Sequence, residues 1–455
     1  MTSPITWQHD ADYERARIGR VFNYRRPSRY PIAVVEASEE SHVDEAVRLA
    51  IQKQCQISIR SGGHSWAVWS VRDDAVLLDL GKFKEIELDE KTGIVKVSPS
   101  VTGRELNDVL QKKGVMFAGG HCPDVGLGGF LLQGGMGWNC KNWGWACEQI
   151  VAMDVVTATA QRLCCSENQN SELLWAARGA GPGFPAVVTR FHLQTRPAYT
   201  CMRSSAYTYA KKDFKKAMNW ILSISASFDP DTEVAAVGAF TPESAEPYTT
   251  ILFVTFKNSE EEALAALKPA EDSHPPGAVA SFFFKETSIS NEYIDQGAAN
   301  PNGYRYRVDN AYINDDADVV DVLEDAFTTL PTRKSFSLWL SMAPGSRRRL
   351  RDMALSMQSD HYFATYVMYE DAADDSVASN WVQSIMKKVE KHSEGAYLGD
   401  ADFQCRKTRF WGNEQGRRLM DLRRKWDPNG RICGYLDAGD GSRVNGLPNK
   451  HEWKL

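Results

Sequence analysis

Three glycine-rich segments near the start of this 455-residue chain limit what it can fold around. They occupy residues 60–64 (Arg-Ser-Gly-Gly-His), 119–129 and 133–137. Because glycine has no Cβ atom, successive backbone amides in such turns can approach a phosphate closely and donate hydrogen bonds to it. The segments do not follow the GxGxxG strand-to-helix pattern, and no P-loop lysine motif is present. They therefore predict a site for a pyrophosphate-containing dinucleotide that is neither a Rossmann site nor an NTPase site, in preference to glycines that serve only tight turns.

Length and composition predict two globular domains without a nucleic-acid or membrane partner. A chain of 455 residues exceeds what one hydrophobic core usually serves. The net charge is −6, and no concentrated basic face for nucleic acid is visible. No apolar run approaches the roughly 18 residues of a membrane span, and the N-terminus has no apolar signal segment, so a cytoplasmic or other intracellular location is expected. The nine cysteines include no CxxC pair, and no metal site is predicted.

The pattern of elements changes once along the chain. Short strand and helix signals alternate over residues 32–160, whereas longer amphipathic helices and strand-like runs follow Arg196 and Pro197. We place a boundary there, which gives a first domain over residues 1–199 and a second over residues 200–407. The tail, residues 408–455, contains a helix that ends before Asp427-Pro428.

Five segments together resemble the berberine-bridge-enzyme-like branch of the vanillyl-alcohol-oxidase superfamily. They are residues 60–64, 122–137, 174–181 (Leu-Trp-Ala-Ala-Arg-Gly-Ala-Gly), 410–413 (Phe-Trp-Gly-Asn) and 425–428 (Lys-Trp-Asp-Pro). The resemblance extends over nearly the whole chain. It implies an α+β protein whose FAD-binding domain has the fold shared with p-cresol methylhydroxylase, is completed by the tail, and is covered by an antiparallel substrate domain.

The resemblance also implies which residues hold the cofactor. His64 would bond to the 8α-methyl carbon of the flavin and Cys122 to its C6 atom, so that FAD is bicovalently attached. Val125 matches a position beside the flavin that gates oxygen, and a small residue there is typical of oxidases that release hydrogen peroxide. The other predicted cofactor-binding residues are Arg60, Ser61, Gly62, Gly63, Gly120, Gly126, Gly128, Gly129, Gly134, Gly135, Gly137 and Asn413.

The substrate side departs from the family pattern. Related proteins present a carboxylate or glutamine on a strand that we align with residues 363–370, where Thr365 cannot act as a strong base. A later family segment has two tyrosines, of which this chain keeps Tyr397 and replaces the second with Asp400. A general base must accept a hydroxyl or amine proton while hydride leaves the adjacent carbon. We predict Asp400 or Tyr397 for this role, the tyrosine only if nearby positive charge lowers its pKa.

These features predict an FAD-dependent oxidase of a small organic alcohol, or an amine, with O2 as electron acceptor. The missing signal segment favours catabolic or secondary metabolism over the secreted carbohydrate oxidases. One alternative is an oxidative cyclase of a natural-product pathway, and another is a flavin-loaded binding protein with little turnover. The sequence leaves the substrate and the oligomeric state open.

Overall fold

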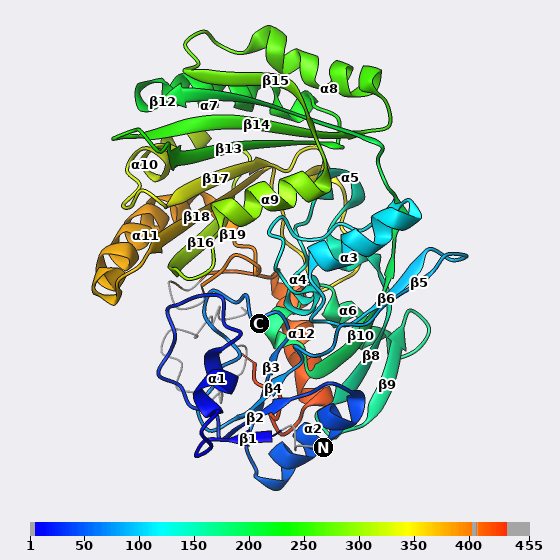
Figure 1. Ribbon diagram of the computed structural model, residues 1–455. Helices are drawn as coiled ribbons and strands as arrows, with labels where there is room; N and C mark the ends of the chain where they lie inside the picture. Colours follow the sequence, from blue (N-terminus) through cyan, green and yellow to red (C-terminus); the bar gives the residue numbers. More distant parts are fainter. Residues whose placement is uncertain (1–4, 403–405, 407, 435–455) are drawn as a thin grey trace.

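The computed structural model describes residues 5–402, 406 and 408–434, which form a lower and an upper part (Figure 1). The first sheet of the lower part has the order β1-β2-β4-β3, with β2, β4 and β3 parallel and β1 antiparallel to β2. Its strands are β1 (Ile5–Trp7), β2 (Ala33–Glu36), β3 (Ile57–Arg60) and β4 (Val76–Asp79). Helix α1 (Tyr13–Ile18) follows β1, and α2 (Glu40–Gln52) joins β2 to β3. The buried residues Val43, Ala46, Val47 and Ala50 recur at helical spacing and pack α2 against the sheet.

The second sheet of the lower part is antiparallel, with the order β5-β6-β10-β8-β9. Its strands are β5 (Ile86–Asp89), β6 (Ile94–Val97), β8 (Ile150–Thr157), β9 (Arg162–Ser166) and β10 (Ala186–Gln194). A small ribbon pairs β7 (Val115–Met116) with β11 (Arg196–Pro197). The helices here are α3 (Gly103–Leu110), α4 (Leu127–Leu132), α5 (Cys140–Trp143) and α6 (Ser171–Ala177).

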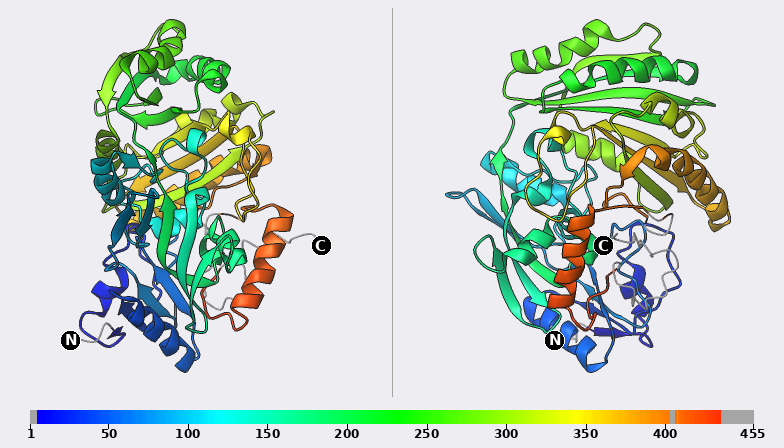
Figure 2. Two further views of the ribbon diagram at one scale, coloured as in Figure 1. Left: turned by 90° about the vertical axis from the view of Figure 1, so that its right-hand side faces the viewer. Right: turned by 180° about the vertical axis from the view of Figure 1, so that it is seen from behind.

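The end of the described chain returns to the lower part through α12 (Asn413–Trp426) (Figure 2). Lys425 Nζ and Trp426 Nε1 both donate to Glu172 of α6, at 2.5 Å and 2.7 Å. The two segments are therefore held together, although Glu172 and Lys425 lie 253 residues apart in the sequence.

The upper part is one eight-stranded antiparallel sheet with the order β15-β12-β14-β13-β17-β18-β16-β19. Its strands are β12 (Cys201–Ala210), β13 (Thr232–Phe240), β14 (Pro247–Lys257), β15 (Ala280–Thr287), β16 (Arg305–Ile313), β17 (Phe336–Ser341), β18 (His361–Tyr369) and β19 (Ser393–Gly395). Its helices are α7 (Phe214–Ile224), α8 (Glu260–Ser273), α9 (Ile289–Ala299), α10 (Val319–Thr328) and α11 (Asp375–Val389). The α+β class predicted from the sequence, with an antiparallel second domain, is confirmed.

The alternation of side chains along the large sheet determines its two surfaces. On β13, Val234 and Ala236 pack into the core formed with α7, α10 and α11, whereas Ala235 and Val237 point the other way and line a cavity. Helices α7, α8, α10 and α11 therefore cover one face of the sheet, whereas α9 lies on the opposite face, which is turned toward the lower part (Figure 1).

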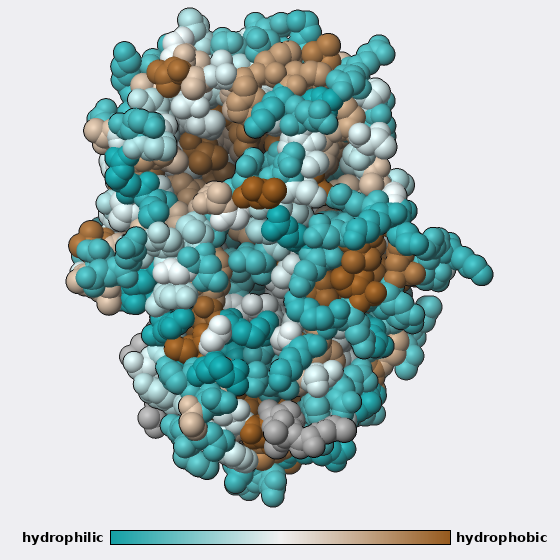
Figure 3. Space-filling view, in the orientation of Figure 1, coloured by the Kyte–Doolittle hydropathy of each residue, from teal (hydrophilic) through white to brown (hydrophobic). Residues whose placement is uncertain are grey.

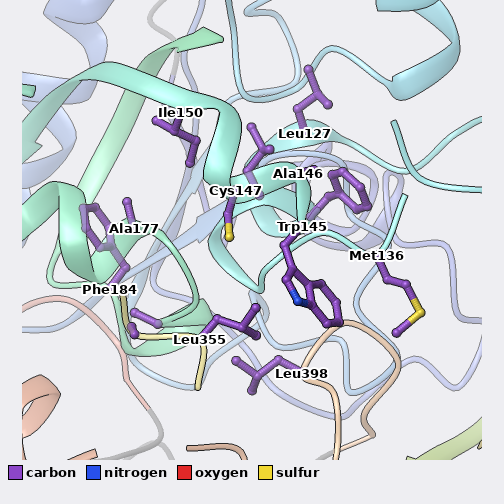
Figure 4. Close-up of a cluster of buried hydrophobic side chains, with 14 of the residues drawn as sticks. Leu127, Met136, Trp145, Ala146, Cys147, Ile150, Ala177, Phe184, Leu355 and Leu398 are labelled. Atoms are coloured by element: carbon purple, nitrogen blue, oxygen red, sulfur yellow. The ribbon is translucent and has the colours of Figure 1, made fainter. Parts of the chain in front are cut away.

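A separate core includes residues of the second and third glycine-rich segments. Leu127, Met136, Trp145 and Cys147 of the lower part meet Leu398 of the upper part in this cluster (Figure 4). The outer surface in the view of Figure 3 is mostly hydrophilic, with separate hydrophobic patches. Over the residues described, no helix combines the length and apolarity needed to cross a membrane.

Candidate functional site

A cavity of about 550 Å3 lies between the glycine-rich turns and the open face of the eight-stranded sheet. Its lining includes most of the predicted site residues: Arg60, Ser61, Gly62, Gly63, His64, Gly120, Cys122, Val125, Gly126, Gly128, Gly129, Tyr397 and Asp400. The sheet contributes mainly apolar side chains: Ala235, Val237, Ala239, Leu252, Val254, Phe336, Leu338, Leu340 and Met368. The fold thus brings three distant segments of the sequence to one cavity.

The first two glycine-rich segments pack closely against each other at the cavity wall. A Cβ atom on Gly62 would lie 2.6 Å from the backbone nitrogen of Gly126, and one on Gly128 would lie 2.6 Å from Oγ of Ser61. By contrast, a Cβ on Gly129 would meet no atom within 4 Å. This glycine-rich wall, in a cavity of this size, fits an extended dinucleotide such as FAD, whose pyrophosphate accepts backbone N–H groups.

A buried indole at the cavity also fits a bound group with an acceptor atom. Trp138 lines the cavity, and its Nε1 is buried without a hydrogen-bond partner among the residues described here. A buried donor without a partner is costly, so a ligand that offered an acceptor atom would be stabilised there.

Four predicted cofactor-binding residues do not line the cavity: Gly134, Gly135, Gly137 and Asn413. Gly134 and Gly135 form a turn behind it with φ values of +111° and +79°, a conformation that favours glycine. A Cβ on Gly137 would lie 2.2 Å from the carbonyl oxygen of Ala118. Asn413 is exposed at the first turn of α12. The three glycines therefore shape the wall indirectly, through close packing.

The guanidinium group of Arg60 forms hydrogen bonds with other residues of the protein. Its Nη2 and Nε donate to Oδ2 of Asp79 at 2.7 Å and 3.1 Å, and its Nη groups also donate to the carbonyl oxygens of Ala16 and Arg17, each at 2.5 Å. These bonds fix the end of β3 immediately before the first glycine-rich turn.

His64 and Cys122 both face the cavity from turns that follow strands of the lower part. The imidazole of His64 stacks on the ring of Phe22, with centroids 3.8 Å apart and an angle of 20° between the planes. Its Nε2 lies 3.2 Å from Oδ1 of Asp124. Burial, with smaller contributions from the Asp124 and Asp400 charges, raises the pKa of the Cys122 thiol. The thiol is therefore protonated at neutral pH.

Asp400 is surrounded by hydrogen-bond donors on one side of the cavity. The Tyr362 hydroxyl donates to its Oδ2 at 2.6 Å. Burial raises the pKa of the Asp400 carboxyl, and the opposing hydrogen bonds from Tyr362, Tyr366 and Trp66 do not cancel this effect. Asp400 is consequently a stronger base than an ordinary aspartate, and it faces the cavity that Cys122 lines.

Tyr397 lacks the property that the sequence analysis required of it as a base. Its hydroxyl oxygen accepts the backbone N–H groups of Gly135 and Met136 at 3.1 Å and 3.0 Å. Burial and the Asp400 charge raise the pKa of Tyr397 and outweigh these bonds. The phenol therefore stays protonated, which leaves Asp400 as the better-placed base.

The register of β18 corrects the alignment made at Thr365. Thr365 is fully buried and accepts a hydrogen bond from Ser337 Oγ at 3.0 Å, whereas Tyr362 and Tyr366 line the cavity. Strand residues alternate between faces, so Thr365 points away from the cavity. The β18 residues that line the cavity are Tyr362, Tyr366 and Met368.

Two polar residues that hold the site were missed by sequence reasoning. Glu233 of β13 lines the cavity, with its Oε2 3.0 Å from Nε2 of His121 and its Oε1 accepting the Asn139 N–H at 2.6 Å. Asn310 of β16 accepts from the backbone N–H of Tyr397 at 2.7 Å and donates to its carbonyl at 2.9 Å. Neither residue belongs to a local motif, because each contact joins segments at least 87 residues apart.

The described residues contain no cluster of three or more His, Cys, Asp or Glu side chains that could hold a metal ion. The titratable side chains that line the cavity offer acid–base chemistry beside a space suited to an organic cofactor.

Comparisons with known proteins agree with this arrangement. Residues 31–166 match the model of a family described as FAD binding domain. Over 432 residues the chain is 39% identical to the FAD-linked oxidoreductase penO of Penicillium crustosum. The alignment covers 95% of this chain and 96% of that protein. It is 25% identical over 464 residues to a carbohydrate oxidase of Microdochium nivale, and this alignment covers 94% of this chain and 91% of that protein. The fold matches the BBE-like 1 structure of Physcomitrella patens with a TM-score of 0.83 at 19% identity. The match covers 99% of this chain and 98% of that chain.

Proposed function

This chain belongs to the FAD-linked oxidoreductases and has the fold of a berberine-bridge-enzyme-like protein, and on that premise we propose that it oxidises a small organic alcohol, or an amine, by removing a hydride. The observation that carries the proposal is Asp400, a carboxylate with a raised pKa in the wall of the cavity that His64 and Cys122 also line. FAD, when bound, supplies the hydride acceptor, and dioxygen takes the electrons onward as hydrogen peroxide.

The residues of the chain divide this work between holding the cofactor and moving a proton. His64 and Cys122 hold FAD covalently, and the open backbone near Gly129 is placed to receive its phosphates. Asp400 accepts the proton of the substrate hydroxyl or amine group. Tyr362 fixes the orientation of that carboxylate through its 2.6 Å hydrogen bond.

The open face of the sheet determines what kind of molecule fits beside Asp400. The side chains of β13, β14 and β17 at the cavity are alanine, valine, leucine and phenylalanine, apart from Glu233, both of whose carboxylate oxygens are already hydrogen-bonded. An apolar wall favours a substrate with an apolar body and one reacting polar group, because hydroxyl groups buried against it would lose their hydrogen bonds.

Anaerobic mixing of the holoenzyme with a panel of alcohols, amines, sugars and hydroxy acids tests the proposal. We expect the visible absorbance of oxidised flavin to bleach with apolar alcohols or amines, and the reduced enzyme to produce hydrogen peroxide when air is admitted. A ring-closed product would favour the oxidative cyclase. A flavin that is inert to every class would favour the binding protein.

A further inference from the structure

Asp124 has no role in the proposed function, yet it contacts the histidine assigned to the cofactor. Its Oδ1 lies 3.2 Å from Nε2 of His64. It also comes two residues after Cys122, so that one short turn carries both the thiol and the partner of the imidazole.

We propose that Asp124 is a positioning residue that holds His64 with its hydrogen on Nε2, and so presents the Nδ1 lone pair as the atom that bonds to FAD. This inference rests on the proposed covalent attachment of the cofactor. A carboxylate only accepts hydrogen bonds, so the nitrogen that faces Asp124 must be the one that carries hydrogen. In a neutral imidazole the other nitrogen is then the nucleophile.

The surroundings of His64 support a fixed ring orientation. Phe22 stacks on one face of the imidazole at 3.8 Å, and Trp66 meets it edge-on with centroids 5.4 Å apart. Within the described part of the chain, Nδ1 makes no hydrogen bond. Burial tends to raise the pKa of the Asp124 carboxyl, but its interactions, the hydrogen bond with His64 foremost, lower this pKa overall, so Asp124 is ionised at neutral pH.

The bond-forming step accounts for the need for a negative partner. The Nδ1 lone pair forms a bond to the 8α-methyl carbon, one C–H bond of that methyl group breaks, and its hydrogen leaves as a proton. The imidazole becomes a cation beside Asp124, and two electrons remain on the flavin. Dioxygen then takes these two electrons with two protons, the one from the methyl group and the one from Nε2, and leaves as hydrogen peroxide. The Asp124 carboxylate stabilises the positive charge that develops on the ring.

Peptide mapping of the purified holoenzyme by mass spectrometry tests this role without measuring turnover. In Asp124→Ala we expect the fraction of His64 peptide that carries FAD to fall at least tenfold, while the Cys122 peptide keeps its flavin. Asp124→Asn retains an acceptor oxygen but no charge, so the fraction of His64 peptide that carries FAD should lie between those of the wild type and Asp124→Ala. This variant replaces Asp124→Ala in the test if the alanine variant does not fold. In the wild type, NMR of the isolated flavin peptide should identify Nδ1 as the linked atom.

Asp154→Ala is the matched control, because Asp154 Oδ2 makes a similar 3.1 Å contact with Nε2 of His192 on the five-stranded sheet. It should leave flavin attachment at His64 unchanged. Full attachment at His64 in both Asp124 variants, or a bond at Nε2 in the wild type, would overturn the inference. Wild-type protein without FAD on either residue would instead contradict the proposed covalent cofactor.

Discussion

The hydroxyl group of Tyr362 donates a 2.6 Å hydrogen bond to Oδ2 of Asp400. Tyr362 lies on β18 of the large sheet, and Asp400 lies in the segment that follows β19. Burial makes the Asp400 carboxyl more basic than usual, and the hydrogen bond limits that increase. The balance leaves a carboxyl group whose pKa lies above that of an ordinary aspartate, so the carboxylate accepts a proton more readily.

Replacing Asp400 with Asn should slow reduction of the bound flavin by roughly 10²- to 10⁴-fold, the range for loss of a general base. Asparagine keeps the size and an acceptor oxygen for Tyr362 but cannot take up the proton. Stopped-flow absorbance under anaerobic conditions measures the rate. The amount of covalent FAD and the melting temperature should match the wild type, and an unchanged rate would exclude Asp400 as the base.

Tyr362→Phe should move the acid limb of the kcat/KM profile to higher pH. The hydrogen bond stabilises the charged form of Asp400, so its loss raises the pKa further, by roughly one unit for a bond to a charged group. Since the ionised carboxylate is the active form, activity falls as the pH drops through this pKa. A limb that stays in place, or moves to lower pH, would show that the profile reports another group.

The fold class and much of the cavity could be predicted from the sequence because their signals are local. The glycine-rich turns can be recognised from the local sequence of residues 60–64 and 119–129 alone. The structure brings His64 and Cys122, which belong to these turns, to one cavity. The position of Thr365 could not be predicted, because a shift of one residue in strand alignment exchanges the two faces of β18. Contacts such as those of Glu233 depend on how the two parts of the molecule meet.

Replacing Glu233 with Gln should destabilise the protein by about 2 kcal/mol, since His121 would lose its charged partner in a largely buried place. Burial tends to lower the pKa of His121, but Glu233 raises it overall. The stabilisation is therefore fully present below the ordinary histidine pKa and is lost as the pH rises through the raised one. Chemical denaturation near pH 6 and near pH 9 should show a wild-type advantage that shrinks at the higher pH.

Glu260→Gln is a suitable control for that measurement, because Glu260 pairs with Arg203 and its side chain is 65% exposed. We expect an effect below about 0.5 kcal/mol. An advantage of wild type over the Glu233 variant that is the same at both pH values would contradict the assignment of its stabilising effect to a charged His121.

Val125→Leu should slow the reaction of the reduced enzyme with dioxygen while leaving anaerobic reduction by substrate nearly unchanged. Val125 lines the cavity in the same turn as Cys122, and the larger side chain would narrow the space through which a small molecule approaches the flavin. A tenfold decrease corresponds to a barrier higher by about 1.4 kcal/mol. The measurement is stopped-flow reoxidation of photoreduced enzyme at several oxygen concentrations, with Val125→Ala as the variant that should react at least as fast as the wild type. Equal reoxidation rates in all three proteins would show that this side chain does not control access of dioxygen.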